Sequence, residues 1–194
     1  MLIRVRHGAN GRRAVRGRKT MQELTAEQAV LLLKSYLGAL KNESRITKNV
    51  LAAVPTEQAE YRPDPASKSA MELVRHIANA DNRFVEAVTT GMFNPVPGIP
   101  DTAKTPAEIA AWYEERHAKN FEALTQATPE QLLKMVDFRG MMQRPAVTFL
   151  MMGLHHTIHH RGQLSSYLRC MGAKVPAIYG ESYDSAQAKR AAEV

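Results

Sequence analysis

The chain has 194 residues, 44% of them hydrophobic, which suits a single domain with one sizeable core. No apolar run approaches the roughly 18 to 20 residues needed to cross a bilayer, and the one cysteine, Cys170, cannot form a disulfide within the chain. These features exclude a disulfide scaffold and a membrane-spanning protein, and they predict a cytoplasmic protein without a membrane partner.

The net charge of +7 is confined to one end of the chain. Residues 1–20 carry seven basic side chains and no acidic one, and the remaining 19 basic and 19 acidic residues cancel. We expect residues 1–20 to be a basic disordered tail or the product of a start assigned too early, because Met21 opens the first well-formed segment. A nucleic-acid-binding arm is the minor alternative, since the stretch lacks interleaved aromatic residues and the folded body is neutral.

A hydroxyl residue followed three positions later by a carboxylate or amide marks the start of a helix. Thr25 with Gln28 predicts a first helix that runs to Pro55. The connector over 55–68 contains two further prolines, through which a helix cannot continue. We therefore expect this connector to be a loop.

Two more helices begin with the same signature. Ser69 with Glu72 predicts a second helix that ends at about Thr90, before a glycine suited to the left-handed conformation that terminates helices. A Pro-rich turn over 94–100 follows. Thr105 with Glu108, and proline at the first helical position, then predicts a third helix over about 105–128.

The next segment contains two short elements and one long helix. Thr128 with Gln131 predicts one short helical turn, and 134–143, with a glycine inside, predicts a brief hairpin. The stretch over 145–170 has no internal proline and predicts a long helix. It carries four of the seven histidines of the chain.

Four long amphipathic segments joined by loops predict an all-α fold, an antiparallel four-helix bundle that occupies residues 21–184. Such bundles often build metal sites from side chains on facing helices. The stretch 174–184 is expected to fold back over the bundle, and 185–194 to form a frayed C-terminal tail.

The last long helix carries two overlapping histidine pairs, 155/159 and 156/160. Residues four apart are neighbours on a helix, so either pair could bind one ion. The helical wheel separates the pairs, because His156 and His160 share an apolar stripe and His155 and His159 lie at its edge. The stripe consists of Phe149, Met152, His156, His160, Gln163 and Tyr167. We predict that His156 and His160 are the metal ligands.

A catalytic zinc or a comparable ion usually takes three protein ligands and keeps one position open. His76 is predicted to be the third ligand, because it lies at the margin of the apolar face of the second helix. His117 is a reserve candidate, but its charged neighbours indicate a solvated position. His159 and Tyr167 are predicted to lie near the ligands, and Gln163 to hydrogen-bond a ligand ring or a bound water. A purely structural role for all these histidines also fits the spacing.

In the segment 156–163, Arg161 and Gly162 follow the histidines directly, and Tyr167 comes shortly after the segment. This pattern resembles the last-helix signature of the DinB/YfiT-like family. The resemblance extends to the segments 61–65 and 174–180, and to the second helix with Glu72 and His76. It covers about residues 22–184 and leaves the basic segment outside.

The resemblance implies a four-helix bundle, frequently a homodimer. It also implies a divalent ion, zinc or nickel, held by His76, His156 and His160. The related enzymes include thiol S-transferases and a thiol-dependent isomerase. The sequence therefore predicts a metal-dependent enzyme that activates a water or thiol nucleophile, with a small-molecule substrate such as a low-molecular-weight thiol. The alternative is a non-catalytic metal-binding or stress-response module in which the ion is structural.

Overall fold

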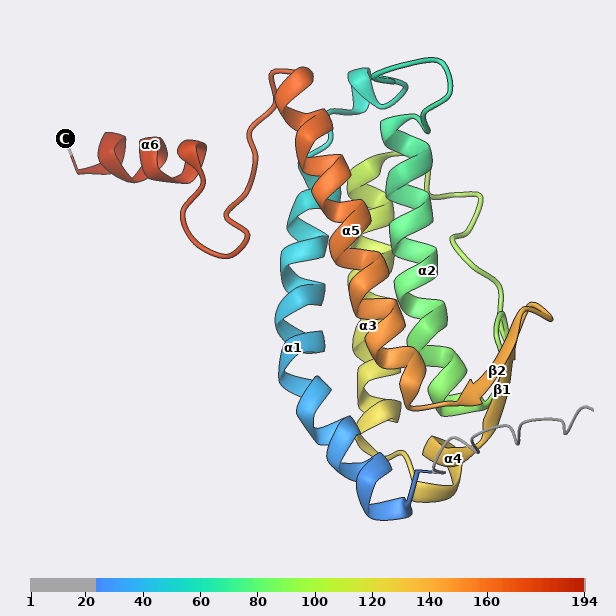
Figure 1. Ribbon diagram of the computed structural model, residues 1–194. Helices are drawn as coiled ribbons and strands as arrows, with labels where there is room; N and C mark the ends of the chain where they lie inside the picture. The colour runs from blue at the N-terminus through green and yellow to red at the C-terminus, as the bar shows by residue number, and fades with distance from the viewer. Residues whose placement is uncertain (1–23, 194) are drawn as a thin grey trace, which may run out of the picture.

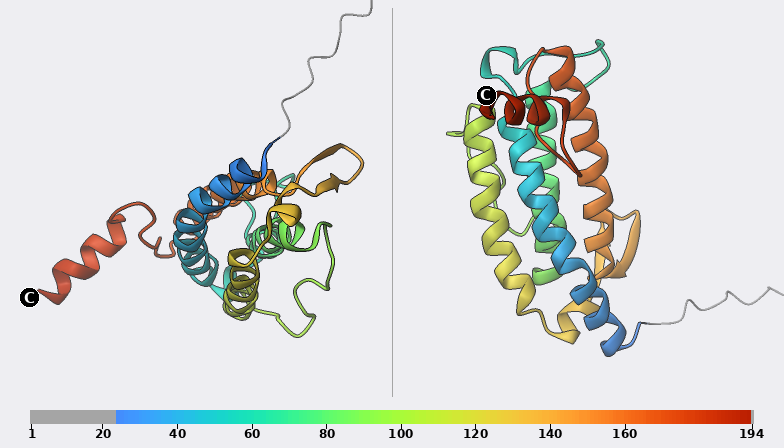
Figure 2. Two further views of the ribbon diagram at one scale, coloured as in Figure 1. Left: turned by 90° about the horizontal axis from the view of Figure 1, so that it is seen from below. Right: turned by 90° about the vertical axis from the view of Figure 1, so that its left-hand side faces the viewer.

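Four long helices lie side by side and enclose the core of the computed structural model, which describes residues 24–193 (Figure 1). They are α1 (Ala26–Ala52), α2 (Ala70–Thr90), α3 (Pro106–Thr125) and α5 (Thr148–Cys170). α1 and α2 each pack against both α3 and α5, so the helices surround a shared interior, as the view along them shows (Figure 2). The basic segment 1–20 lies outside the described residues, and the tail expected there stays a prediction.

The helix starts agree with the predicted capping signatures. At Thr25, Ser69, Thr105 and Thr128, the hydroxyl accepts the backbone N–H three residues later, and the side chain of that residue accepts the N–H of the cap. These reciprocal bonds satisfy backbone donors that a helix start leaves unpaired. Gly91 ends α2 with φ 76°, the left-handed conformation expected there. α1 ends slightly before the predicted Pro55, and a 3-10 turn, Thr56–Gln58, follows it.

A short helix and a hairpin connect α3 to α5. They are α4 (Pro129–Leu133), β1 (Met135–Phe138) and β2 (Met142–Pro145), with the two strands antiparallel. Asp137 accepts the N–H of Gly140, and Arg139 and Gly140 both have positive φ, which closes the turn. The predicted hairpin is confirmed, so the fold is mostly helical with one small sheet. α5 begins three residues after the predicted Pro145, because β2 occupies that residue.

The helix directions differ from the predicted antiparallel arrangement. Tyr113 contacts Asp81 and Asn120 contacts Glu86, so residue numbers rise together along α2 and α3, and these helices are parallel. The segment 91–105 allows this geometry, because its fifteen residues can span about 50 Å when extended and α2 is roughly 30 Å long. Hydrophobic periodicity predicts which face of a helix is buried and carries no information about its direction.

Buried polar side chains divide the core into two apolar clusters. One cluster, around Leu73, Ile77 and Leu164, lies toward the start of α2, and the other, around Phe84 and Phe149, lies toward its end. The polar layer between them consists of Glu43, Thr47, Asp81, Asn82, Glu86, His117, Asn120, Thr157 and Arg161. All four long helices contribute to this layer.

The C-terminal segment returns to the bundle and then leaves it. Tyr179 donates to Glu43 of α1 and accepts from Arg161 of α5, as expected for a stretch that folds back. α6 (Tyr183–Ala192) then extends away from the four helices (Figure 2). A frayed tail was expected here, but Ser182 and Ser185 form a reciprocal cap in which serine replaces the usual acid or amide. No helix within residues 24–193 is long and apolar enough to span a bilayer.

Candidate metal centre

Three imidazole rings from two helices meet at one side of the polar layer. His76 comes from α2, and His156 and His160 come from α5. One ring nitrogen from each lies within 4.8 Å of the others, and the ring centroids are 4.4 to 4.7 Å apart. The structure therefore brings together the three side chains that the sequence predicted as ligands, although His76 and His156 are 80 residues apart along the chain.

The close approach of α2 and α5 sets the position of the rings. A Cβ atom on Gly153 would lie 2.6 Å from the Cβ of Phe84, so only glycine fits at this crossing. One turn later, Thr157 donates to Asp81 at 2.7 Å and links the same two helices. These contacts fix the register in which His76 faces the pair on α5.

The histidine pair lies beside the most buried row of α5 rather than at its centre. The fully buried row runs through Gly153, Thr157 and Arg161, whereas His156 and His160 are half-buried. The helical wheel selected the pair that the structure brings beside His76, but the apolar stripe proposed for it is offset by one residue. The margin position leaves one side of the three rings open to solvent.

Burial keeps the three rings neutral. Desolvation, with the charges of neighbouring basic groups, lowers the pKa of His76 to about 4 and that of His156 to about 4. Desolvation also lowers the pKa of His160, although its hydrogen bond with Gln163 opposes this shift. Neutral imidazole is the form that binds metal ions, so these rings need not lose a proton near pH 7.

The donor set fits a divalent ion. Nε2 of His156 and Nε2 of His76 are 2.9 Å apart, and two nitrogens bound tetrahedrally to zinc are about 3.3 Å apart for bond lengths near 2.05 Å. A shift of a few tenths of an ångström would therefore accommodate the ion. Within residues 24–193, no carboxylate or thiol joins the three histidines. A fourth coordination position is thus free for an exogenous group.

The structure places the three residues that were predicted to lie near the ligands in different surroundings. Gln163 accepts a hydrogen bond from Nδ1 of His160 at 2.7 Å, which orients the ring so that Nε2 is available. His159 is exposed and its ring lies 4.8 Å from that of His160. Tyr167 packs against Tyr61 instead, about 10 Å further along α5, and the position predicted for it near the ligands is wrong.

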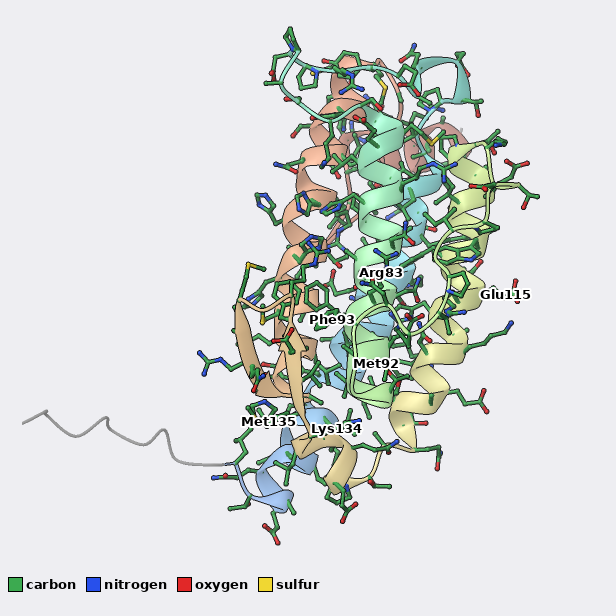
Figure 3. The ribbon with its side chains drawn as sticks, turned by 90° about the vertical axis from the view of Figure 1, so that its right-hand side faces the viewer. Arg83, Met92, Phe93, Glu115, Lys134 and Met135 are labelled. Carbon is green, nitrogen blue, oxygen red and sulfur yellow. The ribbon has the colours of Figure 1, made fainter. Side chains whose placement is uncertain are left out.

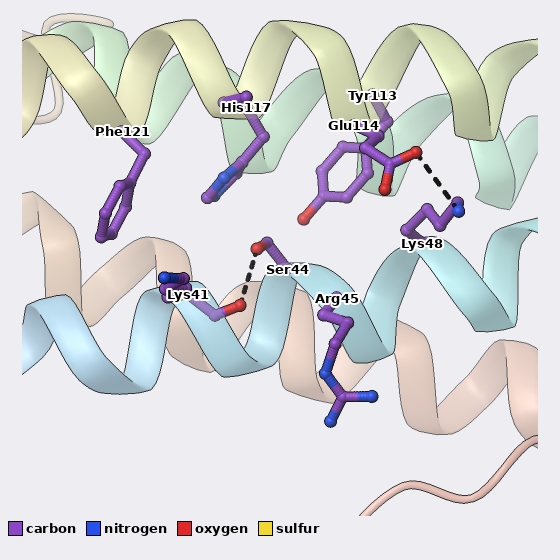
Figure 4. Close-up of a pocket in the computed structure, with 9 residues that line it drawn as sticks. Lys41, Ser44, Arg45, Lys48, Tyr113, Glu114, His117 and Phe121 are labelled. Carbon is purple, nitrogen blue, oxygen red and sulfur yellow. Dashed lines mark hydrogen bonds and ion pairs between the residues drawn. The ribbon is translucent and has the colours of Figure 1, made fainter.

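His117 is buried, which corrects the solvated position inferred from its charged neighbours. The residue is 4% exposed and lies beside a cavity of about 260 Å³ between α1 and α3. Figure 4 shows His117 and Tyr113 of α3 opposite Ser44 and Lys41 of α1. Desolvation lowers its pKa, while Asp81 at 3.7 Å opposes the shift. His117 belongs to the polar layer and not to the histidine cluster.

Sequence reasoning missed the polar layer that supports the site. Asp81 accepts hydrogen bonds from Tyr113 at 2.5 Å and from Thr157 at 2.7 Å, and so joins α2, α3 and α5. One signal was available, because Asp81 stands four residues after Ile77 and three before Phe84, on the apolar face of the second helix. An acid within such a stripe indicates a buried hydrogen-bonded carboxylate.

A cleft of about 410 Å³ opens beside His76 and His156. It lies between α2, the segment that follows α2 and the tip of the hairpin, and aromatic and basic side chains line it. Because His76 and His156 line this cleft, an exogenous group bound there can reach these two rings.

Known proteins are similar to this chain in sequence and in fold. YjoA of Bacillus subtilis is 29% identical over 130 residues, which cover 66% of this chain and 82% of YjoA. The crystal structure of YjoA, described as a DinB-like protein, matches with a TM-score of 0.63 at 25% identity and covers 76% of this chain and 99% of that one. A DinB-like protein from Bacillus cereus gives 0.61 at 25% identity, over 75% and 97% of the two chains.

The family model extends this likeness to nearly the whole chain. It matches residues 21–192, which include all four long helices, the hairpin and the three clustered histidines. The basic segment 1–20 lies outside the match. The chain belongs to the DinB family.

Proposed function

We propose that this protein is a metal-dependent enzyme in which His76, His156 and His160 hold a divalent ion, zinc or nickel. One observation carries the proposal: three neutral imidazoles from α2 and α5 converge within 4.8 Å beside an open cleft. When bound, such an ion lowers the pKa of a coordinated water or thiol and yields a nucleophile near neutral pH.

The side chains of the site have separable roles in this proposal. The three rings bind the ion, and Gln163 fixes the tautomer of His160 by accepting from its Nδ1. The cleft beside His76 accommodates a small molecule, such as a low-molecular-weight thiol and its acceptor. Glu72 lines this cleft, but its hydrogen bonds with Ser69 and its ion pair with Arg62 lower its pKa, so it is a weak base.

A structural ion is the competing function. Structural zinc sites are closed by four protein ligands, whereas catalytic sites have three and a position for water or substrate. Among the described residues the cluster contains three histidines and no fourth ligand. This donor count favours chemistry over a structural role.

Metal analysis of purified variants tests the ligand set. We expect about one ion per chain in the wild type after loading and desalting, and a large loss in His160→Ala and His76→Ala. The matched control is His155→Ala, which removes an exposed histidine from the same helix and should keep the wild-type stoichiometry. Equal losses in His155→Ala and His160→Ala, measured by elemental analysis, would overturn the assignment.

A thiol-transfer screen tests the catalytic step. The metal-loaded protein is incubated with several low-molecular-weight thiols and an electrophilic acceptor, and consumption of thiol is followed against the His160→Ala variant. Faster consumption by the wild type supports catalysis. A protein that binds stoichiometric metal but accelerates no thiol or water reaction would favour the structural ion.

The proposal also includes a homodimer in the cytoplasm. The family resemblance supports the dimer, and Cys170, which is exposed at the end of α5, has no disulfide partner within the described residues, which suits a reducing compartment. Light scattering of the metal-loaded protein measures its mass in solution. A mass of one chain at micromolar concentration would contradict the dimer.

A further inference from the structure

The cleft beside the histidine cluster carries an excess of positive charge. Lys68, Arg75, Arg83 and Arg139 line it, and Glu72 is its one acidic residue. Glu72 is already paired with Arg62 at 2.9 Å, so it does not balance these four cations. Residues 21–194 as a whole carry 19 basic and 19 acidic side chains, so the excess of positive charge is local to this cleft.

The four cations differ in how much binding capacity they retain. Arg75 donates to the carbonyl of Ala103 at 2.5 Å and has a structural role. Arg83 has a buried Nε with no hydrogen-bond partner among the described residues, although a buried guanidinium donor normally has one. Arg83 projects from α2 on the same face of the molecule as Phe93 (Figure 3). Arg83 also lines the cleft, so its guanidinium charge acts on an anion there.

Lys68 and Arg139 add two further positive charges to the lining of the cleft. Lys68 lies just before the N-terminal cap of α2, and Arg139 lies at the tip of the hairpin, with its guanidinium 5.6 Å from the centre of the Phe138 ring. Both side chains line the cleft together with His76. A divalent ion at the cluster would add further positive charge, so the local field selects for anions.

Aromatic side chains line part of the same cleft. Phe84 from α2, Phe93 from the segment after it and Phe138 from the hairpin pack with ring centroids 4.9 to 6.1 Å apart. The Phe84 ring is also 5.7 Å from that of His156, so this aromatic lining extends to the histidine cluster. Such a surface binds an apolar body of about the size of one ring.

We infer that the substrate of this site is an organic anion, with a phosphonate, phosphate or carboxylate group held by Arg83 and Arg139 and an apolar body against the three phenylalanines. Guanidinium groups bind such oxyanions through paired N–H donors. The placement beside His76 and His156 puts the reactive part of the molecule next to the metal. The reaction of this anion rests on the proposed function, whereas its binding depends on the cleft alone.

Calorimetric titration with phenylphosphonate tests the inference in metal-free protein, where the cleft acts without the ion. We expect binding that weakens at least about tenfold in Arg83→Gln and in Arg139→Gln. The matched control is Arg45→Gln, which removes one exposed cation from α1, far from the cleft, and should leave the affinity unchanged. Wild-type affinity in both cleft variants would overturn the inference.

Two further ligands separate the contributions of charge and ring. Benzyl alcohol has the ring without the charge, and inorganic phosphate has the charge without the ring. Each should bind at least about tenfold more weakly than phenylphosphonate. Equal binding of benzyl alcohol would overturn the anionic assignment, and equal binding of phosphate would overturn the apolar one.

Metal content distinguishes this inference from the proposed function. Arg83→Gln and Arg139→Gln should bind as much metal as the wild type, because neither arginine belongs to the histidine cluster. If the protein binds no metal but phenylphosphonate binding still depends on the two arginines, the anion site stands without the proposed chemistry. If metal binds normally and neither arginine affects phenylphosphonate, the inference fails by itself.

Discussion

Imidazole binds metal ions in its neutral form, and the histidine cluster keeps that form by burial. His76 and His156 are half-buried, and the neighbouring histidines, with Lys68 and Arg139 in the case of His76, add to the cost of charging them. Their pKa values of about 4 lie well below the ordinary value of 6.5. The same shift makes the stability of the metal-free protein depend on pH.

The pH dependence has a defined sign. Below pH 6.5 the unfolded chain binds protons at these histidines, whereas the folded chain does not bind them until about pH 4. Stability of the metal-free protein should therefore fall as the pH drops from 6.5 toward 4. We expect the thermal midpoint of chelator-treated wild type to fall more across this window than that of His76→Gln. His155→Gln should follow the wild type, and parallel curves for wild type and His76→Gln would contradict the cause.

Individual side chains were predictable where the helical phase decides their neighbours. His156 and His160 could be chosen over His155 and His159 because their angular position relative to the apolar residues of the helix is a local property. The burial of His117 was not predictable in this way, since it depends on the packing of α3 against other helices, which places Asp81 of α2 3.7 Å from its ring. Tyr167 shares the phase of the histidines but lies too far along the helix to reach them.

Among the elements, the pair α2 and α5 decides whether a site exists. Their contact is closest at Gly153, where a Cβ atom would overlap the Cβ and Cγ of Phe84. Both atoms are near the backbone and cannot move away cheaply. The glycine therefore sets the separation of the two helices that carry the three rings.

Two glycines of α5 provide a matched test. Gly153→Ala should cost about 1 to 3 kcal/mol in the free energy of unfolding, because the added methyl group overpacks the crossing. It should also reduce metal stoichiometry, since α2 and α5 must separate. Gly162→Ala has nothing within 4 Å of the new Cβ and should stabilise by about 0.5 to 1 kcal/mol through helix propensity. Chemical denaturation measures both, and a neutral Gly153→Ala would contradict the close approach.

The connections between elements explain why the helices are not all antiparallel. The segment 53–69, with its 3-10 turn, stays at one end of the bundle where it joins α1 to α2, and α4 and the hairpin join α3 to α5 at the other (Figure 1). The segment 91–105 instead runs along the bundle and lets α3 start beside the start of α2 (Figure 1). Phe93, which belongs to this crossover, lines one side of the cleft. The topology and the cleft thus have a common origin.

Across the whole molecule, a polar layer joins the four helices between two apolar clusters. Its largest fully buried side chain is Arg161, which is 1% exposed, pairs with Glu43 of α1 at 2.5 Å and donates to Tyr179 of the C-terminal segment at 2.8 Å. Arg161 follows His160 directly, so the residue after the cluster links α5 to α1. The histidine cluster therefore depends on contacts made across the entire bundle.

Replacement of Arg161 tests this role. Arg161→Met leaves the largely buried carboxylate of Glu43 without its cation and should cost about 3 to 5 kcal/mol. Arg169→Met breaks the more exposed pair with Asp184 and should cost about 0 to 1 kcal/mol. Equilibrium denaturation of both variants gives the comparison. Similar losses at the two positions would show that burial of the Arg161 pair has no special weight.

The sequence alone determined the four long helices, their capping residues, the hairpin and the histidine pair on α5, because these depend on contacts within a few residues. Only the tertiary structure decided the parallel packing of α2 and α3, the polar layer around Asp81 and Arg161, and the basic cleft beside His76. Those features depend on side chains that are distant along the chain, and local spacing carries no information about which helices meet. α5 therefore carries two of the three clustered histidines at a local spacing, and the packing of α2 against α5 brings in the third.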